Sequence, residues 1–178
     1  MNGIEQIAET FFRENDISVR LSYDMPQGYE TAFGTYDCVI NTLFLNMAIM
    51  KDAPEYEILF YLYHELRHAV QYLHPERCDK RVQESRFYVV LYNGCCFRLE
   101  GDCWRECMLD GAEDDFVQAY MGIPYEMDAN AFAYEKTREV CGDLPQLRRL
   151  YESWLPEKAW TDEVYRRLFA RIDAQLAQ

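Results

Sequence analysis

The sequence predicts an α+β fold, with a few short strands near the N-terminus and several helices after them. Two patterns point to this class. Residues 17–23 alternate apolar and polar side chains, which is typical of a strand. Residues 54–73 carry apolar side chains at the spacing of one helical face. With 178 residues, 49% of them hydrophobic, the chain can bury a core, and we expect one domain over residues 1–178.

The first half of the chain consists of short periodic segments that end in one long helix. The segments before that helix are a helix at 4–15, a strand at 17–23, and one strand or two short strands within 35–45. Asp52 as an N-cap and Pro54 in the first turn indicate the start of the long helix at 54–73. Pro75 indicates its end.

The pattern is less regular after the long helix. Residues 76–122 contain a helix-like piece at 82–92, a cysteine-rich stretch and an acidic turn at 110–115, and we expect this part to be an insertion in the domain. Three further helices are expected after it, at 124–140, 144–154 and 162–177.

Acidic side chains outnumber basic ones by 31 to 18, which gives a net charge of −13. Such a surface repels phosphate, so the charge argues against a nucleic-acid partner and against a basic membrane-binding face. No apolar run approaches the roughly 18 residues that span a bilayer. The first five residues lack the basic and apolar stretches of a secretion signal. The sequence therefore predicts a cytoplasmic protein that binds neither nucleic acid nor membrane.

Seven cysteines without a secretion signal indicate reduced thiols. Four of them lie between Cys95 and Cys107, at spacings that differ from the paired C-x-x-C pattern of a structural zinc site. We interpret them as buried, inert thiols, and a second metal or redox site is the alternative.

One motif inside the long helix carries recognisable chemistry, His64-Glu65-Leu66-Arg67-His68. Histidines four residues apart share a helix face, so both imidazoles can bind one zinc ion. Glu65 lies beside the first histidine and can take a proton from a zinc-bound water, whose pKa the metal lowers to about 7. The motif predicts attack of activated water on a carbonyl carbon, with Glu65 as the general base. The alternative is a solvated helix face with incidental histidines.

The third zinc ligand has more than one candidate. His74 follows His68 after five residues, which is the metzincin spacing. That motif needs a glycine where this chain has Gln71, because the helix must turn there, and glutamine favours continued helix. An unbroken helix would carry His74 about 9 Å along its axis from His68.

Glu126, in the helix expected at 124–140, is the preferred third ligand. It shares a helix face with Ala129, Asn130 and Ala133, and the small alanines would let this helix pack closely against the helix of the zinc motif. Asn130 would then accept a hydrogen bond from the non-metal nitrogen of a zinc histidine. Asp128 is a further alternative ligand, although it points off that face.

These features together resemble the ImmA/IrrE-type metallopeptidases of bacteria and mobile elements, which are zincins of the gluzincin kind. The resemblance covers roughly residues 17–73 and 124–138. It rests on the strand that ends at Asn41, the helix with the His-Glu-x-x-His motif, and the later Glu126-x-x-Ala129-Asn130-x-Phe132-Ala133. Arg67 replaces the glycine common in that family's zinc helix.

The resemblance implies a zincin-like fold, in which a small, mostly antiparallel sheet packs on the zinc-binding helix and further helices follow. It implies that His64, His68 and Glu126 hold Zn2+ and that Glu65 is the catalytic base. The edge strand, expected within 35–45, would hold a peptide or protein substrate in extended form. The implied activity is zinc-dependent hydrolysis of peptide bonds.

Two other functions are compatible with parts of the sequence. A non-catalytic zinc-binding or regulatory interaction protein of a mobile element would keep the ligands but would not need Glu65. An acidic mimic of nucleic acid would need a stripe of carboxylates, whereas the sequence has one dense patch at 113–115.

Overall fold

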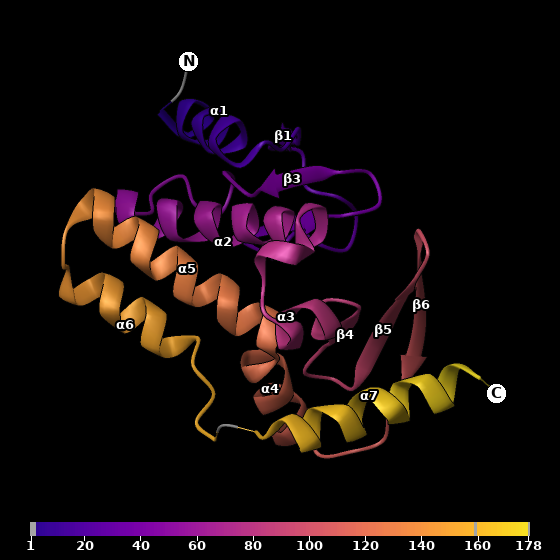
Figure 1. The fold of residues 1–178 in the computed structure, drawn as a ribbon. Helices are drawn as coiled ribbons and strands as arrows, with labels where there is room; N and C mark the ends of the chain where they lie inside the picture. Colours follow the sequence, from indigo (N-terminus) through magenta and orange to yellow (C-terminus); the bar gives the residue numbers. More distant parts are fainter. Residues whose placement is uncertain (1–2, 159, 178) are drawn as a thin grey trace. The chain divides into compact units, whose positions relative to one another are not determined.

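The chain combines helices with small sheets (Figure 1). The computed structural model describes residues 3–158 and 160–177, so Met1 and Asn2, at the start of the segment examined for a secretion signal, lie outside the described residues. The described residues form seven α-helices and two three-stranded sheets, which confirms the α+β class. In this described part, no helix is both long and apolar enough to cross a membrane.

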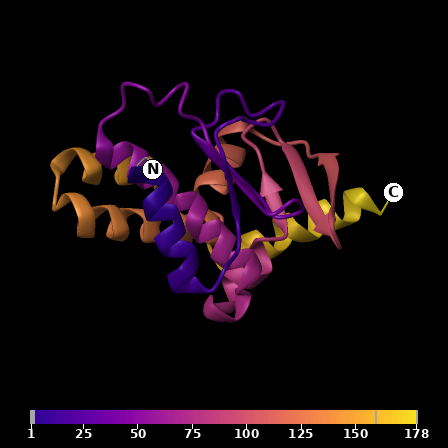
Figure 2. The ribbon, with the colours of Figure 1, turned by 90° about the horizontal axis from the view of Figure 1, so that it is seen from above.

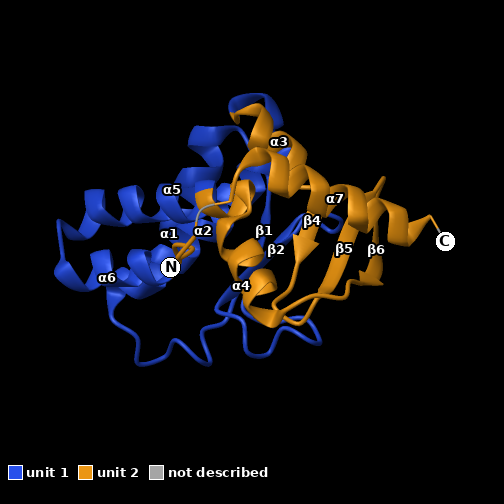
Figure 3. Ribbon diagram, turned by 90° about the horizontal axis from the view of Figure 1, so that it is seen from below, with its two compact units in different colours: residues 1–77, 128–153 blue, residues 78–127, 154–178 orange. Residues whose placement is uncertain are grey.

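The elements group into two compact units, coloured separately in Figure 3. Unit 1 contains residues 1–77 and 128–153, and unit 2 contains residues 78–127 and 154–178. Helix α5 (Pro124–Cys141) begins in the residues assigned to unit 2 and continues through those of unit 1.

The sheet of unit 1 contains three short strands in the order β1-β3-β2. They are β1 (Arg20–Ser22), β2 (Gly34–Asp37) and β3 (Thr42–Leu45). The central strand β3 is buried along its length and pairs parallel with β1 and antiparallel with β2. The segment expected at 35–45 is therefore two strands, and Asn41 joins them in a left-handed conformation with φ of 49°.

Helix α2 (Glu55–Leu73) is the centre of unit 1, and it packs against β2, β3 and α1 (Gly3–Asn15). Figure 2 shows α1, in indigo, running beside the purple α2. The apolar face expected from the sequence is buried, and its fully buried leucines are Leu59, Leu62 and Leu66. The helix α6 (Pro145–Ser153) also contacts α2.

The start of α2 differs from the expectation in one respect. Its N-cap is Pro54 rather than Asp52, and the Pro54 side chain makes no capping hydrogen bond. The Pro54 carbonyl accepts hydrogen bonds from the backbone N–H groups of Glu57 and Ile58, at 3.0 and 3.3 Å. Pro54 is extended, with ψ of 154°, so the helix begins after it.

Unit 2 contains a fully antiparallel sheet in the order β4-β5-β6, with helices against it. Its strands are β4 (Tyr88–Val90), β5 (Cys95–Glu100) and β6 (Cys103–Met108). Its helices are α3 (Lys80–Ser85), α4 (Glu113–Gly122) and α7 (Asp162–Leu176). Helix α7 packs on β5 and β6, and its Tyr165, Leu168 and Ile172 are buried in the core of this unit.

Two expectations for this region were wrong. The helix expected at 82–92 ends at Ser85, and β4 follows at Tyr88. The acidic stretch at 110–115 is a turn only in part, since α4 begins at Glu113. Three acidic residues in the first turn of α4 are well placed for the positive end of the helix dipole, a signal that the turn interpretation missed.

The cysteine-rich stretch is a β-hairpin, with Gly101 in a left-handed conformation at its turn. The insertion expected at about 76–122 stays a prediction, and the corresponding segment 78–127 groups with the C-terminal residues 154–178. The helices expected after the insertion are present as α5, α6 and α7.

Candidate metal centre

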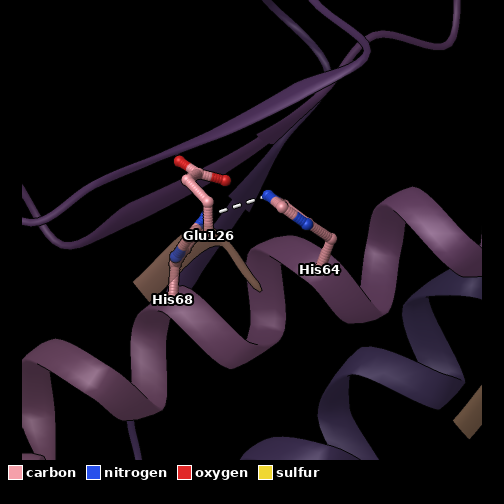
Figure 4. Close-up of side chains that lie close together, drawn as sticks. All are labelled: His64, His68 and Glu126. Carbon is pink, nitrogen blue, oxygen red and sulfur yellow. Dashed lines mark hydrogen bonds between the residues drawn. The ribbon is translucent and has the colours of Figure 1, made fainter. Parts of the chain in front are cut away.

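Two imidazoles on one face of α2 form the base of the site (Figure 4). His64 and His68 stand one turn apart, as their spacing in a helix requires. Their Nε2 atoms face each other at 2.9 Å. His68 is 7% exposed, whereas His64 is half-buried, so the pair lies at the edge of the buried face of α2.

Glu126, in the first turn of α5, completes a group of three metal-binding side chains. One ligand atom from each of His64, His68 and Glu126 lies within 4.8 Å of the other two. Among the described residues, this is the group of three or more such side chains that could hold a metal ion.

The three side chains fit a zinc ion by donor type and by spacing. Two imidazole nitrogens and one carboxylate oxygen are a common ligand set of catalytic zinc, which leaves a fourth position for water or substrate. A tetrahedral ion with Zn–N bonds of about 2.0–2.1 Å would hold its two nitrogens about 3.3 Å apart. The observed 2.9 Å between the Nε2 atoms is within a few tenths of an ångström of that value.

A chain of polar contacts continues from His68 away from this group. His68 Nδ1 lies 2.8 Å from Gln71 Oε1, and Gln71 Nε2 donates to Asp128 Oδ2 at 2.7 Å. Arg67 Nε donates to the same oxygen at 2.7 Å, and Arg67 Nη2 donates to Asp128 Oδ1 at 3.1 Å. These contacts hold α5 against α2 at Asp128, two residues after Glu126.

Gln71 has a part in the site that the sequence interpretation did not assign to it. The sequence predicted only that Gln71 would let the helix continue. This prediction is confirmed, because α2 continues past Gln71 to Leu73. The available signal was its spacing, because a residue three positions after His68 shares its helix face. Asn130 is buried, with 3% of its surface exposed, and its expected bond to a zinc histidine stays a prediction.

The two other proposed ligands have different partners. His74 ends α2, and its ring contacts Glu76 Oε1 at 3.0 Å and the Asp16 carbonyl oxygen at 3.2 Å. Asp128 binds Arg67 and Gln71 through its carboxylate. The group that could hold a metal includes neither of them.

The expected catalytic base, Glu65, lies against strand β2 of unit 1. Its side chain is 6% exposed. Gly34 of β2 lies beside it, since a Cβ added at Gly34 would stand 3.1 Å from Glu65 Oε1. The carboxylate is therefore held between the helix that carries the histidines and the edge strand of the sheet.

All seven cysteines are free thiols, but they are not uniformly buried. Cys78, Cys95 and Cys96 are buried, which agrees with inert thiols, whereas Cys103 is exposed. Burial raises the pKa of the Cys95 thiol to about 11 and that of Cys96 to about 12. A raised thiol pKa disfavours the thiolate that binds metals and reacts with disulfides.

The chain was compared with known protein families, with curated proteins and with solved structures. None of these comparisons found a match.

Proposed function

We propose that the protein is a zinc-dependent peptidase. His64, His68 and Glu126 would hold the metal. The observation that carries the proposal is the convergence of these three side chains within 4.8 Å. The two histidines are on α2, which also bears the buried Glu65 next to His64. Two residues of this group and Glu65 lie in the His-Glu-x-x-His pattern, whose helical context is present.

Each protein group has a defined task in this reaction. Zinc, when bound, supplies Lewis acidity and activates water as the nucleophile. Glu65 would take the proton that this water releases as it attacks the carbonyl carbon, and would later pass it to the leaving amine. Its burial against Gly34 restricts the directions in which the carboxylate can point.

A zincin-like fold is part of the proposal, and the small sheet of unit 1 supports it. Helix α2 packs against β2 and β3, and β2 is an edge strand of the sheet. An extended peptide could add to β2 as a further strand, which would bring one of its carbonyl groups toward α2. The proposed substrate is accordingly a peptide or an unfolded stretch of protein.

Metal content tests the ligand set directly. Wild-type protein is loaded with zinc, dialysed and measured by atomic absorption, and we expect about one zinc per chain. The variants His64→Ala and Glu126→Ala should lose the metal, and His74→Ala is the matched control that should keep it. The opposite pattern, with loss in His74→Ala and retention in Glu126→Ala, would rule out the proposed ligands.

Hydrolysis tests the role of Glu65. Cleavage of a fluorescently labelled unfolded protein is followed for the zinc-loaded wild type and for Glu65→Gln. We expect Glu65→Gln to keep its zinc and to lose cleavage by at least about 100-fold, since general acid–base catalysis contributes on that scale. Equal behaviour of the two proteins, with zinc bound in both, would favour the alternative of a non-catalytic zinc-binding or regulatory protein.

A further inference from the structure

We propose that Gln71 and Asp128 are positioning residues of the metal centre. They would set the tautomer and orientation of His68 and hold the turn of α5 that carries Glu126. This inference rests on the proposed function, because it presumes that His68 and Glu126 bind zinc.

The hydrogen bonds of Gln71 determine which nitrogen of His68 carries the proton. A carboxylate accepts hydrogen bonds, so the amide nitrogen of Gln71 must face Asp128 Oδ2, 2.7 Å away. The amide oxygen then faces His68 Nδ1 at 2.8 Å and accepts from it. Nδ1 therefore holds the proton, and Nε2 presents its lone pair toward His64, as a metal ligand must.

Asp128 is itself held at two points. Arg67 donates to both of its oxygens, at 2.7 and 3.1 Å, and the Arg67 guanidinium lies 5.2 Å from the centre of the Phe132 ring, which is also on α5. A two-point contact of this kind fixes the plane of the carboxylate as well as its position. Arg67 thus keeps Asp128 Oδ2, which accepts the hydrogen bond of Gln71, in place.

The same contacts restrict Glu126. It precedes Asp128 by two residues in one continuous helix, so fixing Asp128 against α2 also fixes the backbone of the turn that bears Glu126. These hydrogen bonds therefore restrict two proposed ligands. They act on His68 through its ring and on Glu126 through the backbone of α5. Arg67 belongs to this network because it binds both oxygens of Asp128.

Without its hydrogen bonds, the buried amide of Gln71 would destabilise the fold. Its side chain is 0% exposed on a helix face that is mostly apolar, and burial of an amide is unfavourable unless its hydrogen bonds are made. A purely structural link between two helices would also satisfy this amide. The test must therefore include a property that only the metal site reports.

Zinc affinity and the spectrum of bound cobalt provide that property. The variant Gln71→Met keeps the length of the side chain and removes its hydrogen bonds to His68 and Asp128. We expect its zinc affinity, measured by competition with a chromogenic chelator, to fall about 10- to 100-fold. We also expect the visible absorption bands of bound Co2+ to shift, because an unrestrained His68 changes the ligand geometry.

A second variant covers the case in which Gln71→Met does not fold. Asp128→Ala truncates a side chain that is 28% exposed, so the fold should tolerate it better, and its zinc affinity should fall at least about tenfold. The matched control is Thr137→Val, which removes a buried hydroxyl of α5 whose Oγ1 has no hydrogen-bond partner among the described residues. This control should bind zinc as tightly as the wild type, with the same cobalt spectrum.

The outcomes separate this inference from the proposed function. Wild-type affinity and an unchanged cobalt spectrum in folded Gln71→Met or in Asp128→Ala would overturn the positioning role. If the wild type binds no zinc, or binds it equally well after His64→Ala, the proposed function fails, and the positioning role fails with it. Lower stability of the apo variants with an unchanged cobalt spectrum would assign the network a structural role only, which also overturns the inference.

Discussion

Gly34 of the edge strand β2 lies directly against Glu65 of helix α2. A Cβ atom at position 34 would stand 2.8 Å from Glu65 Cγ and 3.1 Å from both Glu65 Oε1 and the Phe44 carbonyl oxygen. Real Cβ atoms essentially never approach another heavy atom to under 3.0 Å. The strand can come this close to the proposed catalytic base because residue 34 has no side chain.

The variant Gly34→Ala should therefore impair hydrolysis more than metal binding. The added methyl would push the Glu65 side chain or the strand by several tenths of an ångström, and small displacements of a catalytic group can cost up to about 100-fold in rate. We expect kcat/KM for the labelled unfolded protein to fall at least about tenfold, while zinc content stays at the wild-type level. Gly3→Ala is the control, since a Cβ there meets no atom of the other described residues within 4 Å. Wild-type kcat/KM in Gly34→Ala would contradict this account of Gly34.

The turn between β2 and β3 should depend on Asn41. This residue has φ of 49°, its Nδ2 donates to the Ser18 carbonyl oxygen at 2.7 Å, and its Oδ1 accepts from the Tyr36 hydroxyl at 2.8 Å. We expect Asn41→Ala to lower the free energy of unfolding by about 1–3 kcal/mol, through the lost hydrogen bonds and the unfavourable backbone conformation.

The comparison with Asn41→Gly separates these two causes. Glycine adopts positive φ without a steric cost but makes neither side-chain bond, so Asn41→Gly should be the less destabilised of the two variants. Urea unfolding followed by circular dichroism measures both. An Asn41→Ala protein as stable as the wild type would show that the turn does not need this residue.

The thiols should differ in reactivity in the folded protein. Cys103 is exposed on β6, whereas burial raises the pKa of Cys95 to about 11 and of Cys96 to about 12. At pH 8 the thiolate fractions of Cys95 and Cys96 are then very small. We expect iodoacetamide followed by peptide mass analysis to label Cys103 first, and labelling in urea to remove the difference. Labelling of Cys96 at the rate of Cys103 in the folded state would contradict the packing of the hairpin.

Tyr88 should make stability fall at alkaline pH. Burial, and then the hydrogen bond that its hydroxyl donates to Asp173 at 3.0 Å, raise its pKa to about 12, against about 10 in an unfolded chain. A group whose pKa is raised on folding stabilises the folded state below the unfolded pKa. That contribution is lost as pH rises from about 10 through about 12.

The variant Tyr88→Phe isolates this contribution from those of the other tyrosines. It should be less stable than the wild type at pH 9, and the difference should shrink between about pH 10 and pH 12, as measured by urea unfolding at each pH. The tyrosinate absorbance of the wild type should also contain one late-titrating group that the variant lacks. A stability difference that is constant over this range would exclude the linkage.

The elements that follow regular periodicity were predicted well from the sequence. The helices α1, α2 and α5 occur within one or two residues of the expected bounds. Helices α1 and α2 have a regular apolar face, and α5 begins at Pro124 and ends just before Gly142. The region after α2 was predicted poorly. The segment expected as one helix at 82–92 contains a short helix and then β4, which is stabilised by pairing with β5. Such pairing depends on a partner strand that local periodicity does not reveal.

The same division applies to the candidate site. Local sequence was sufficient to bring His64 and His68 to one helix face with Glu65 beside them, because spacing along a helix is a property of the helix itself. Only the tertiary structure decided that Gln71 lies between His68 and Asp128. Its bond to Asp128 joins residues 57 positions apart, so it exists only once α5 packs on α2.

The contact between Gly34 and Glu65 also exists only in the tertiary structure. Neither residue carries a local signal for the other, and their closeness follows from the packing of β2 on α2. Periodicity specifies which face of an element is buried, whereas the identity of the neighbour on that face depends on how separate elements pack. The two histidine ligands could therefore be predicted from the motif, whereas the groups that would orient His68 became visible only in the folded chain.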